Sequence, residues 1–512
     1  QFAFCASTWE ALTRALPFGP ERIAAAVLDD GDPTPPSPSR EAMPRWVEAV
    51  LRRGLAARDR FASMEPLLDA LSRDPTRVWT RRLAATAIVT GMVAAFGIGS
   101  LSRADRDADG PPEDPCSGGA AVLESAWPSV QREAAFSRVA ALGAGDGATV
   151  ASHARERVEA YGARWISAHR DACLAHRRGE HSDALLDRRM ACLHRGSTAL
   201  QTFGEVVGDV EANAIVDLAI VVSGLPDPDR CGDLSALTTG SAPPPAAAGP
   251  IGERLAAATV LRNANRLDAA QAELDRVVAD ARALEYGPLL AETLLARGVL
   301  LIDRKDRAAA ATPLREAVDV ALASGAVAVA VEAWGQLEWV VATGPASLRE
   351  RPLEGRALML QLAEQQPLGH ATMSLYNNLA GVEPYARDTQ AAAALLRRAI
   401  DIARHLGPAA DRTLASALGN LAPLLTDPGE RDRVHAEAVA RWTAIAGPEH
   451  PRTLRARGLQ AIALTDLDAS ITTLTELCAL LERSGAGASG SASNCAQQLA
   501  LAHELQGHTE AC

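Results

Sequence analysis

The sequence contains almost no lysine, because Lys305 is the single lysine among its 51 basic residues. Arginine is used elsewhere, and this bias is typical of a GC-rich coding sequence. The 63 acidic residues outnumber the basic ones and give a net charge of −12. Because the arginines are scattered along the chain, the charge pattern excludes the basic patch of a nucleic-acid-binding protein.

Aromatic residues are also scarce, at 4% of the chain, whereas alanine is abundant throughout. This composition favours helices that pack through small side chains over a β-sandwich. Apolar residues at 48% and charged residues at 22% are ordinary values for a globular protein. We therefore expect an all-α fold, and the length allows about three domains.

One long apolar run, Leu83–Leu101, divides the chain and carries no charge. As a helix it would span about 28 Å, which is close to the hydrocarbon thickness of a bilayer. Arg77, Arg81 and Arg82 precede it and an acidic segment follows, so the positive-inside rule places residues before it in the cytoplasm. We predict a single transmembrane helix at 83–101 in the plasma (inner) membrane, with the N-terminus in the cytoplasm and the C-terminal region extracytoplasmic. A buried core helix is the alternative.

Residues 1–76 predict a small helical bundle. Apolar residues recur at helical spacing in QFAFCASTWEALTRALPF, and Pro17 should end this helix. A short amphipathic segment, ERIAAAVLD, and a Pro-rich turn, DPTPPSPS, come next. The run from Met43 to Leu71 then predicts two helices, with a break near Arg58–Arg60 and a new cap at Ser63.

The order of these segments resembles the C-terminal third of a bacterial serine/threonine protein kinase domain. The first motif of that family, D-x-[FYW]-[SA]-[FL]-[GC]-x-x-x-[WY]-E-[ML]-L followed by P-F, is matched by Gln1, Phe2, Ala3, Phe4, Cys5, Trp9, Glu10, Ala11, Leu12, Pro17 and Phe18. The second, a-v-L-x-R-G-L followed by R-[FWY]-x-S-M-x-x-L-L-x-x-L, is matched by Val50, Leu51, Arg53, Gly54, Leu55, Arg60, Phe61, Ser63, Met64, Leu67, Leu68 and Leu71. The spacer from Leu55 to Arg60 is shorter than is usual in the family. An unrelated helical bundle is the alternative.

The resemblance implies four structural positions of a kinase lobe, which are Phe4, Trp9, Glu10 and Arg60. In the family, the Arg that matches Arg60 pairs with the Glu of an A-P-E motif. That motif is absent here, so we expect Arg60 to lack this partner.

The catalytic motifs of a kinase are missing. Phosphoryl transfer requires a Gly-rich loop, a phosphate-binding Lys, an HRD Asp and a DFG Asp, and none of these precedes the apolar run. His169-Arg170-Asp171 is a decoy, because His176 stands where the family has Asn and no DFG follows. We predict no catalytic, cofactor-binding or metal-binding residue in this chain and no ATP binding. The chain begins with Gln1, so we expect the parent protein to carry the kinase core upstream, with its ATP and Mg²⁺.

Residues 116–238 predict an extracytoplasmic helical domain, with helices at 119–142, 148–177, 182–208 and 210–223. A Pro- and Ala-rich linker at 239–250 follows. The domain holds four cysteines, an even number that suggests disulfides outside the cytoplasm. Three pairings are possible, and we favour Cys173 with Cys192 and Cys116 with Cys231. The alternative is a zinc site in which Cys173, His176, Cys192 and His194 supply four ligands, with His169 and His181 close in the sequence.

Residues 251–512 predict a repeat of helix pairs that resembles tetratricopeptide repeats. Gly298 marks a close contact in the first helix of one pair, and small or apolar residues mark the second helices, at Ala270, Ala310, Ala392, Val434, Ala469 and Ala511. Their intervals are 40, 82, 42, 35 and 42, so one degenerate unit should lie around Arg351. This period resembles the kinesin-light-chain type of the repeat. A non-repetitive helical domain is the alternative.

Two expectations concern the end of the chain. Residues 485–493, GAGASGSAS, should form a flexible linker rather than a nucleotide-binding loop. The helix NCAQQLALAHELQGH should lack the second helix of its pair, which would begin near Ala511.

Together these parts resemble a membrane-anchored, receptor-like serine/threonine kinase. The resemblance implies that the parent phosphorylates Ser or Thr in the cytoplasm, and that the outer repeats bind a protein or peptide and regulate it. Another copy of the parent, in a homodimer, is a further expected partner. The alternative is a membrane-anchored repeat scaffold without kinase activity. A third interpretation is an entirely soluble α-helical protein.

Overall fold

The computed structural model describes the chain as two compact units, Gln1–Pro112 and Glu113–Cys512. The described residues are 1–18, 43–56, 60–72, 114–142, 147–212, 214–234, 237, 244–349, 353–366, 369–382, 387–448, 450–463, 466–483 and 490–507. Every element of regular structure in these ranges is a helix, which confirms the all-α class. The predicted transmembrane helix, Leu83–Leu101, lies outside them. No helix in the described part is long and apolar enough to cross a membrane.

The first unit contains the described helices α1 (Phe2–Thr13), α3 (Arg45–Leu55) and α4 (Met64–Ser72). Helix α1 ends earlier than the expected stop at Pro17, because Arg14 takes a left-handed conformation with φ of 57°. The break between α3 and α4 falls where the sequence predicted it. The three helices share a small core, formed by Cys5, Trp9, Phe18, Met43, Leu51, Leu55 and Leu67.

The second unit begins with a helical domain. Its helices are α6 (Gly119–Ala126), α7 (Ser129–Leu142), α8 (Gly147–Arg177), α9 (Asp183–Gly208) and α10 (Leu218–Ser223). The helix expected at 119–142 is two helices, because Trp127 is extended and Pro128 begins a new turn. The helix expected at 210–223 is shorter, and a 3₁₀ turn at Ile215–Asp217 precedes it. Aromatic side chains fill the core, which includes Trp127, Phe136, Trp165 and Phe203.

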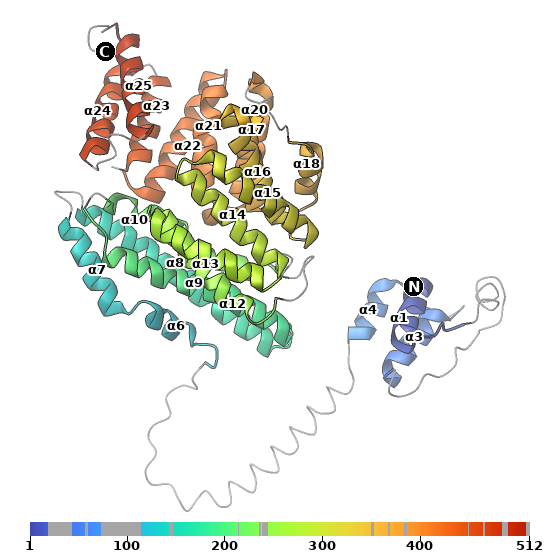
Figure 1. Ribbon diagram of the computed structural model, residues 1–512. Helices are drawn as coiled ribbons and strands as arrows, with labels where there is room; N and C mark the ends of the chain where they lie inside the picture. The colour runs from blue at the N-terminus through green and yellow to red at the C-terminus, as the bar shows by residue number, and fades with distance from the viewer. Residues whose placement is uncertain are drawn as a thin grey trace, which may run out of the picture. The chain divides into compact units, whose positions relative to one another are not determined.

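Consecutive helices follow and pack on one another in chain order, except that α16 packs on α19 and carries the short helices α17 and α18 beside it (Figure 1). They are α12 (Ala248–Asn263), α13 (Leu267–Ala283), α14 (Gly287–Asp303), α15 (Arg307–Ala323), α16 (Val327–Thr343), α17 (Ala346–Arg349), α18 (Arg356–Gln365), α19 (His370–Leu379), α20 (Thr389–Leu406), α21 (Asp411–Leu421), α22 (Pro428–Ala446), α23 (Pro451–Ala463), α24 (Leu467–Arg483) and α25 (Gly490–Leu505). The expected linker at 239–250 therefore ends at residue 247, and the last residues of the linker expected at 485–493 are helical.

A repeated contact sets the spacing of the helix pairs. In α14, a Cβ atom added to Gly298 would lie 2.5 Å from the side chain of Leu314 in α15. In α23, a Cβ atom added to Gly458 would lie 2.8 Å from the side chain of Leu474 in α24. Each pair is a small residue and a leucine sixteen positions later. The same spacing recurs among buried residues of two other helix pairs, at Ala258 with Leu274 and at Ala380 with Leu396.

The second helix of each of these pairs carries a small residue four positions before its leucine. Ala270, Ala310 and Ala392 occupy this position and are buried, as the sequence predicted. The mark at Ala469 is wrong by one residue, since Ala469 is exposed. Ser470 is buried in its place, and its hydroxyl donates to the carbonyl of Gly458 at 3.2 Å.

Two other register marks differ from expectation. In α22 the leucine position is taken by His435, which is buried, whereas the predicted mark Val434 is partly buried beside it. The predicted mark Ala511 lies outside the described residues. The spacing of the leucine positions is therefore regular after α20, with intervals of 39 from Leu396 to His435 and 39 from His435 to Leu474.

The degenerate unit expected around Arg351 has a short second helix, α18. Glu338 stands in α16 where the other pairs have a small residue, and it is almost fully buried. Arg356, at the start of α18, donates to both carboxylate oxygens of Glu338 at 2.9 and 2.8 Å. A bidentate ion pair thus replaces the close helix contact in this unit.

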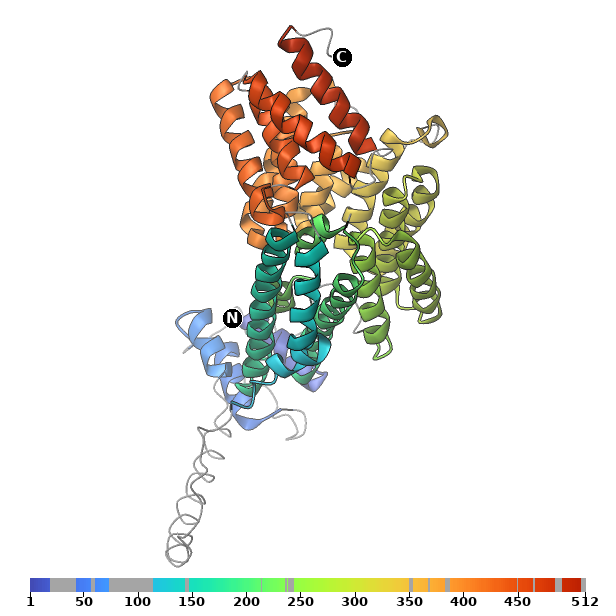
Figure 2. The ribbon, with the colours of Figure 1, turned by 90° about the vertical axis from the view of Figure 1, so that its left-hand side faces the viewer.

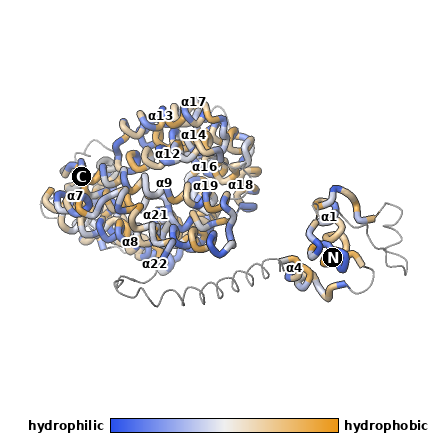
Figure 3. Tube along the Cα trace, turned by 90° about the horizontal axis from the view of Figure 1, so that it is seen from below, coloured by the Kyte–Doolittle hydropathy of each residue, from blue (hydrophilic) through white to orange (hydrophobic). Residues whose placement is uncertain are grey.

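The last described helix, α25, packs on α24 (red in Figure 2). Its Cys495 forms a disulfide with Cys478 of α24. It therefore has one partner, while the residues near Ala511 lie outside the description. Apolar and polar stretches alternate along the tube, as expected for helices with one buried face (Figure 3).

Candidate functional site

The helical domain contacts the first helices of the repeat array along α9. Helix α9 packs on α12. The guanidinium of Arg195 in α9 donates to the carboxylate of Glu292 in α14 at 2.9 Å. The hydroxyl of Thr198 donates to the carboxylate of Glu253 in α12 at 3.4 Å. These contacts fix the start of the array to the helical domain.

The helical domain also contacts helices that lie far along the sequence. Ile220 of α10 is buried against residues of α21, α22 and α23, and these residues form one small core that includes Ala415, Trp442, Ile445 and Ala446. We call this core the junction. Figure 1 shows α10 beside α22, although more than two hundred residues separate them.

Polar contacts surround the junction. A ring nitrogen of His153 lies 3.2 Å from the carbonyl of Ile445, and Arg157 donates to the carbonyl of Ala444 at 3.3 Å. Nε2 of the buried His450 lies 3.1 Å from a carboxylate oxygen of Asp217. Burial lowers the pKa of Arg157, since the charged guanidinium loses water around it.

The array therefore makes an arch whose first and later helices both pack on the helical domain. The sequence predicted that the repeats bind a protein or peptide. Residues of the helical domain contact α12 at the start of the array and α21, α22 and α23 further along it. Helices α16 and α19 lie between them in the array.

Two arginines lie near the junction without an ion-pair partner. No described carboxylate lies within ion-pair distance of Arg412 or Arg452, although Arg452 stacks on the ring of Trp442 at 5.1 Å. Burial, followed by the charges of Arg452 and Arg262, lowers the pKa of Arg412 to about 10. Burial also lowers the pKa of Arg452. The charges of Asp217 and Asp303 oppose the lowering of the pKa of both arginines.

The predicted disulfide pairing is wrong. The structure pairs Cys116 with Cys173 and Cys192 with Cys231. Cys173 and Cys192 lie on adjacent antiparallel helices, but they do not face each other. Ala172 is buried in the core, and successive residues of a helix point about 100° apart, so Cys173 is turned towards the segment that precedes α6. Cys192 is turned in the same way towards the 3₁₀ turn at Pro228–Gly232.

The alternative of a zinc site does not fit this arrangement, because all four cysteines of the domain are oxidised. No group of three or more potential metal ligands occurs in the described part of the chain. His169 stacks on Trp165 with ring centroids 5.3 Å apart, and burial lowers its pKa. A ring nitrogen of His176 lies 3.2 Å from the carbonyl of His181.

The decoy motif His169-Arg170-Asp171 lies within the long helix α8 rather than in a catalytic loop. Arg170 pairs with Asp114 at 2.8 Å. Arg170 thus contacts the segment that leads into α6.

The residues assigned to a kinase lobe occupy different environments. Trp9 is buried in the core of the first unit, and Glu10 is exposed. Phe4 is 38% exposed. Arg60 lies over the ring of Phe2 at 5.5 Å, and no described carboxylate pairs with it. Burial raises the pKa of the free thiol of Cys5, which packs beside Trp9.

The sequence interpretation missed the third disulfide, between Cys478 and Cys495. An available signal was the even number of cysteines after the apolar run once the terminal Cys512 is set aside. It also missed Ile220, Asp217 and the residues around them, because nothing local marks a contact between segments so distant in the chain.

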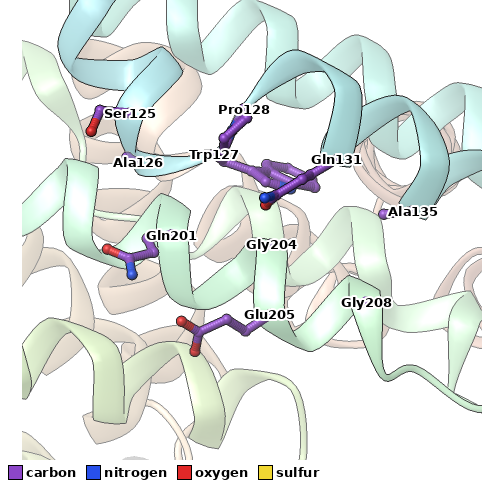
Figure 4. Close-up of a pocket in the computed structure, with 10 residues that line it drawn as sticks. All are labelled: Ser125, Ala126, Trp127, Pro128, Gln131, Ala135, Gln201, Gly204, Glu205 and Gly208. Atoms are coloured by element: carbon purple, nitrogen blue, oxygen red, sulfur yellow. The ribbon is translucent and has the colours of Figure 1, made fainter.

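Two surface pockets of the second unit lack the convergent polar groups of an active site. One has a volume of about 330 Å³ beside Trp127 and is lined by α6, α7 and α9. In Figure 4 the side chains of Gln201 and Glu205 point away from the Trp127 ring. The other has a volume of about 370 Å³ between α20 and α22, where Glu430 and Glu437 are already paired with arginines.

A comparison with models of protein families found no match to this chain, and none of the curated proteins matches it.

Proposed function

We propose that this chain is the C-terminal part of a membrane-anchored, receptor-like serine/threonine protein kinase. In this proposal residues 1–76 are the end of a cytoplasmic kinase lobe and 83–101 cross the membrane. The helical domain and the repeat array then lie outside. They bind a protein or peptide, and binding regulates ATP-dependent phosphorylation by the parent protein.

The observation that carries the proposal is the environment of α1. One side of this helix is buried through Cys5 and Trp9. Phe4, about 100° around the helix from Cys5, is 38% exposed, and Leu12, on the same face as Cys5 one turn beyond Trp9, is 41% exposed. Large apolar side chains left exposed on so small a unit favour a further surface that covers them. The kinase resemblance supplies such a surface, since the motif matched by this helix is buried in the family.

The cysteines support two compartments. Cys5, before the apolar run, is a free thiol. Each described cysteine after the run is in a disulfide. Disulfides persist outside the cytoplasm, where free thiols are oxidised. This division agrees with the orientation that the flanking arginines predict.

Regulation is tested on the parent kinase in lipid vesicles with a change at the junction. Ile220→Asp places a charge in the junction core, whereas Val130→Asp makes the same type of change at a position that is 80% exposed. We expect Ile220→Asp to alter autophosphorylation and Val130→Asp to leave it unchanged. Hydrogen exchange in α10 reports whether the junction has opened. An opened junction with unchanged autophosphorylation would refute regulation through the outer domain.

Membership of the kinase family is tested separately by the reading frame upstream of Gln1. We expect it to encode the HRD, DFG and APE motifs. A start codon at this point, or a parent that transfers no phosphate from ATP, would support the repeat scaffold without kinase activity.

A further inference from the structure

The last described helix, α25, is held on the array by a narrow contact. Of the side chains described in this helix, those of Cys495 and Ala502 are buried. Leu499 lies between them on the same face and is partly buried, whereas Leu501 and Leu505 are exposed. In the described part of the chain, the extended contact of α25 is with α24. The buried apolar contact therefore consists mainly of an alanine, part of a leucine and a half-cystine.

The disulfide between Cys478 of α24 and Cys495 of α25 lies at one end of this contact. At the other end, Gln506 donates to the carboxylate of Asp468 in an exposed hydrogen bond, which competes with water. Docking also buries the side-chain oxygen of Gln498 without a hydrogen-bond partner among the described groups. Burial of an unpaired oxygen opposes docking. The disulfide is thus the main link between the two helices.

The other two disulfides are braced by polar contacts. Arg170 binds Asp114, two residues before Cys116, at 2.8 Å. Arg189 donates to the carbonyl of Cys231 at 3.0 Å. Both disulfides also belong to the helical domain, which has an aromatic core of its own. Loss of either one therefore leaves its segment held by other contacts.

We propose that the disulfide between Cys478 and Cys495 is a redox-sensitive clasp that controls the docking of α25 on α24. A disulfide restricts the chain in the released state, and reduction removes this restriction. Cys478 is partly exposed and Cys495 is buried, so a thiolate of a dithiol reductant attacks Sγ of Cys478, and Cys495 leaves as the thiolate. The second thiol of the reductant then displaces Cys478. The reductant is oxidised to a disulfide, and both cysteines become thiols.

Release of α25 changes the end of the array. Leu474 and Leu477 of α24 are buried in the small core that also contains Cys495 and Ala502. When α25 leaves, the side of α24 that faces this core is uncovered. The oxidised chain therefore carries a covered helix pair here, and the reduced chain carries an apolar edge. This inference does not depend on the kinase proposal.

The test measures hydrogen exchange of α25 in the full chain by mass spectrometry, with and without dithiothreitol as the dithiol. The double variant Cys478→Ser with Cys495→Ser removes the clasp alone. Cys116→Ser with Cys173→Ser is the matched control, because it removes a disulfide of the helical domain. We expect exchange in α25 to be at least tenfold faster in the reduced unmodified chain and in the clasp variant. In the control under oxidising conditions it should be unchanged.

Three results would overturn the proposal. One is unchanged exchange in α25 after complete reduction, which alkylation of the thiols establishes. Another is a control variant that accelerates exchange in α25 as much as the clasp variant does. The third is equal acceleration in α21 and α25, which would show general unfolding. If the clasp variant does not fold, the reduced unmodified chain is reoxidised with oxidised glutathione; protection of α25 should then return, and its failure to return refutes the clasp.

Discussion

The repeated close contact between helices predicts opposite effects of the same substitution at two glycines. Gly298→Ala places a methyl group 2.5 Å from Leu314, so the two helices must shift or the leucine must change rotamer. Overpacking of this kind costs about 1–3 kcal/mol. Alanine recovers about 0.8–1.0 kcal/mol of helix propensity. We therefore expect a net destabilisation of roughly 0–2 kcal/mol.

Gly419 in α21 is the matched control. It occupies the same register, sixteen residues before His435, but a Cβ atom there would meet nothing within 4 Å. Gly419→Ala should therefore stabilise α21 by up to about 1 kcal/mol. The difference between the two variants isolates the contact with Leu314, because both gain the same kind of helix propensity.

Hydrogen exchange measured by mass spectrometry is the suitable assay, since repeat arrays open locally rather than all at once. We expect exchange in α14 and α15 to be up to roughly 30-fold faster in Gly298→Ala, and exchange in α21 up to about fivefold slower in Gly419→Ala. In a Leu314→Ala background, Gly298→Ala should become stabilising. If Gly298→Ala slows exchange in the unmodified background, the close packing of α14 on α15 is refuted.

Three further predictions follow from the same structure. His435 is buried at a leucine position, and its pKa is lowered by burial and, to a lesser extent, by the charge of Arg431. As the pH falls below about 6.5, the histidine therefore takes up a proton in the unfolded state before it does so in the folded state. Thermal stability should therefore decrease below this pH, and His435→Leu should reduce that dependence; an unchanged slope in thermal melts would contradict this. Arg356→Ala leaves the buried Glu338 unpaired and should destabilise the degenerate unit by about 3 kcal/mol. Hydrogen exchange in α16 should become faster, and unchanged exchange would show that the carboxylate is not buried. Peptide mapping under non-reducing conditions should recover three cross-linked peptides, Cys116–Cys173, Cys192–Cys231 and Cys478–Cys495. A Cys173–Cys192 peptide should be absent.

Local patterns in the sequence were sufficient for much of the helical structure. The all-α class, the break between α3 and α4, and the small residues Ala270, Ala310 and Ala392 depend on contacts within a few turns of helix. The period of the array follows from these, because each helix pair repeats the same local contact. The sequence interpretation also located the degenerate unit, where a regular interval is missing.

Tertiary structure decided which faces of those helices meet. The disulfide pairing depended on the rotation of Cys173 about the axis of α8, and a change of one residue turns a side chain by about 100°. The exact register was altered at Ser470 and His435, where a polar side chain occupies a buried site. The later helices of the array contact Ile220 because the small rotations between successive helix pairs add up along the array. That sum depends on all the packing contacts together, so no single segment of the sequence determines it.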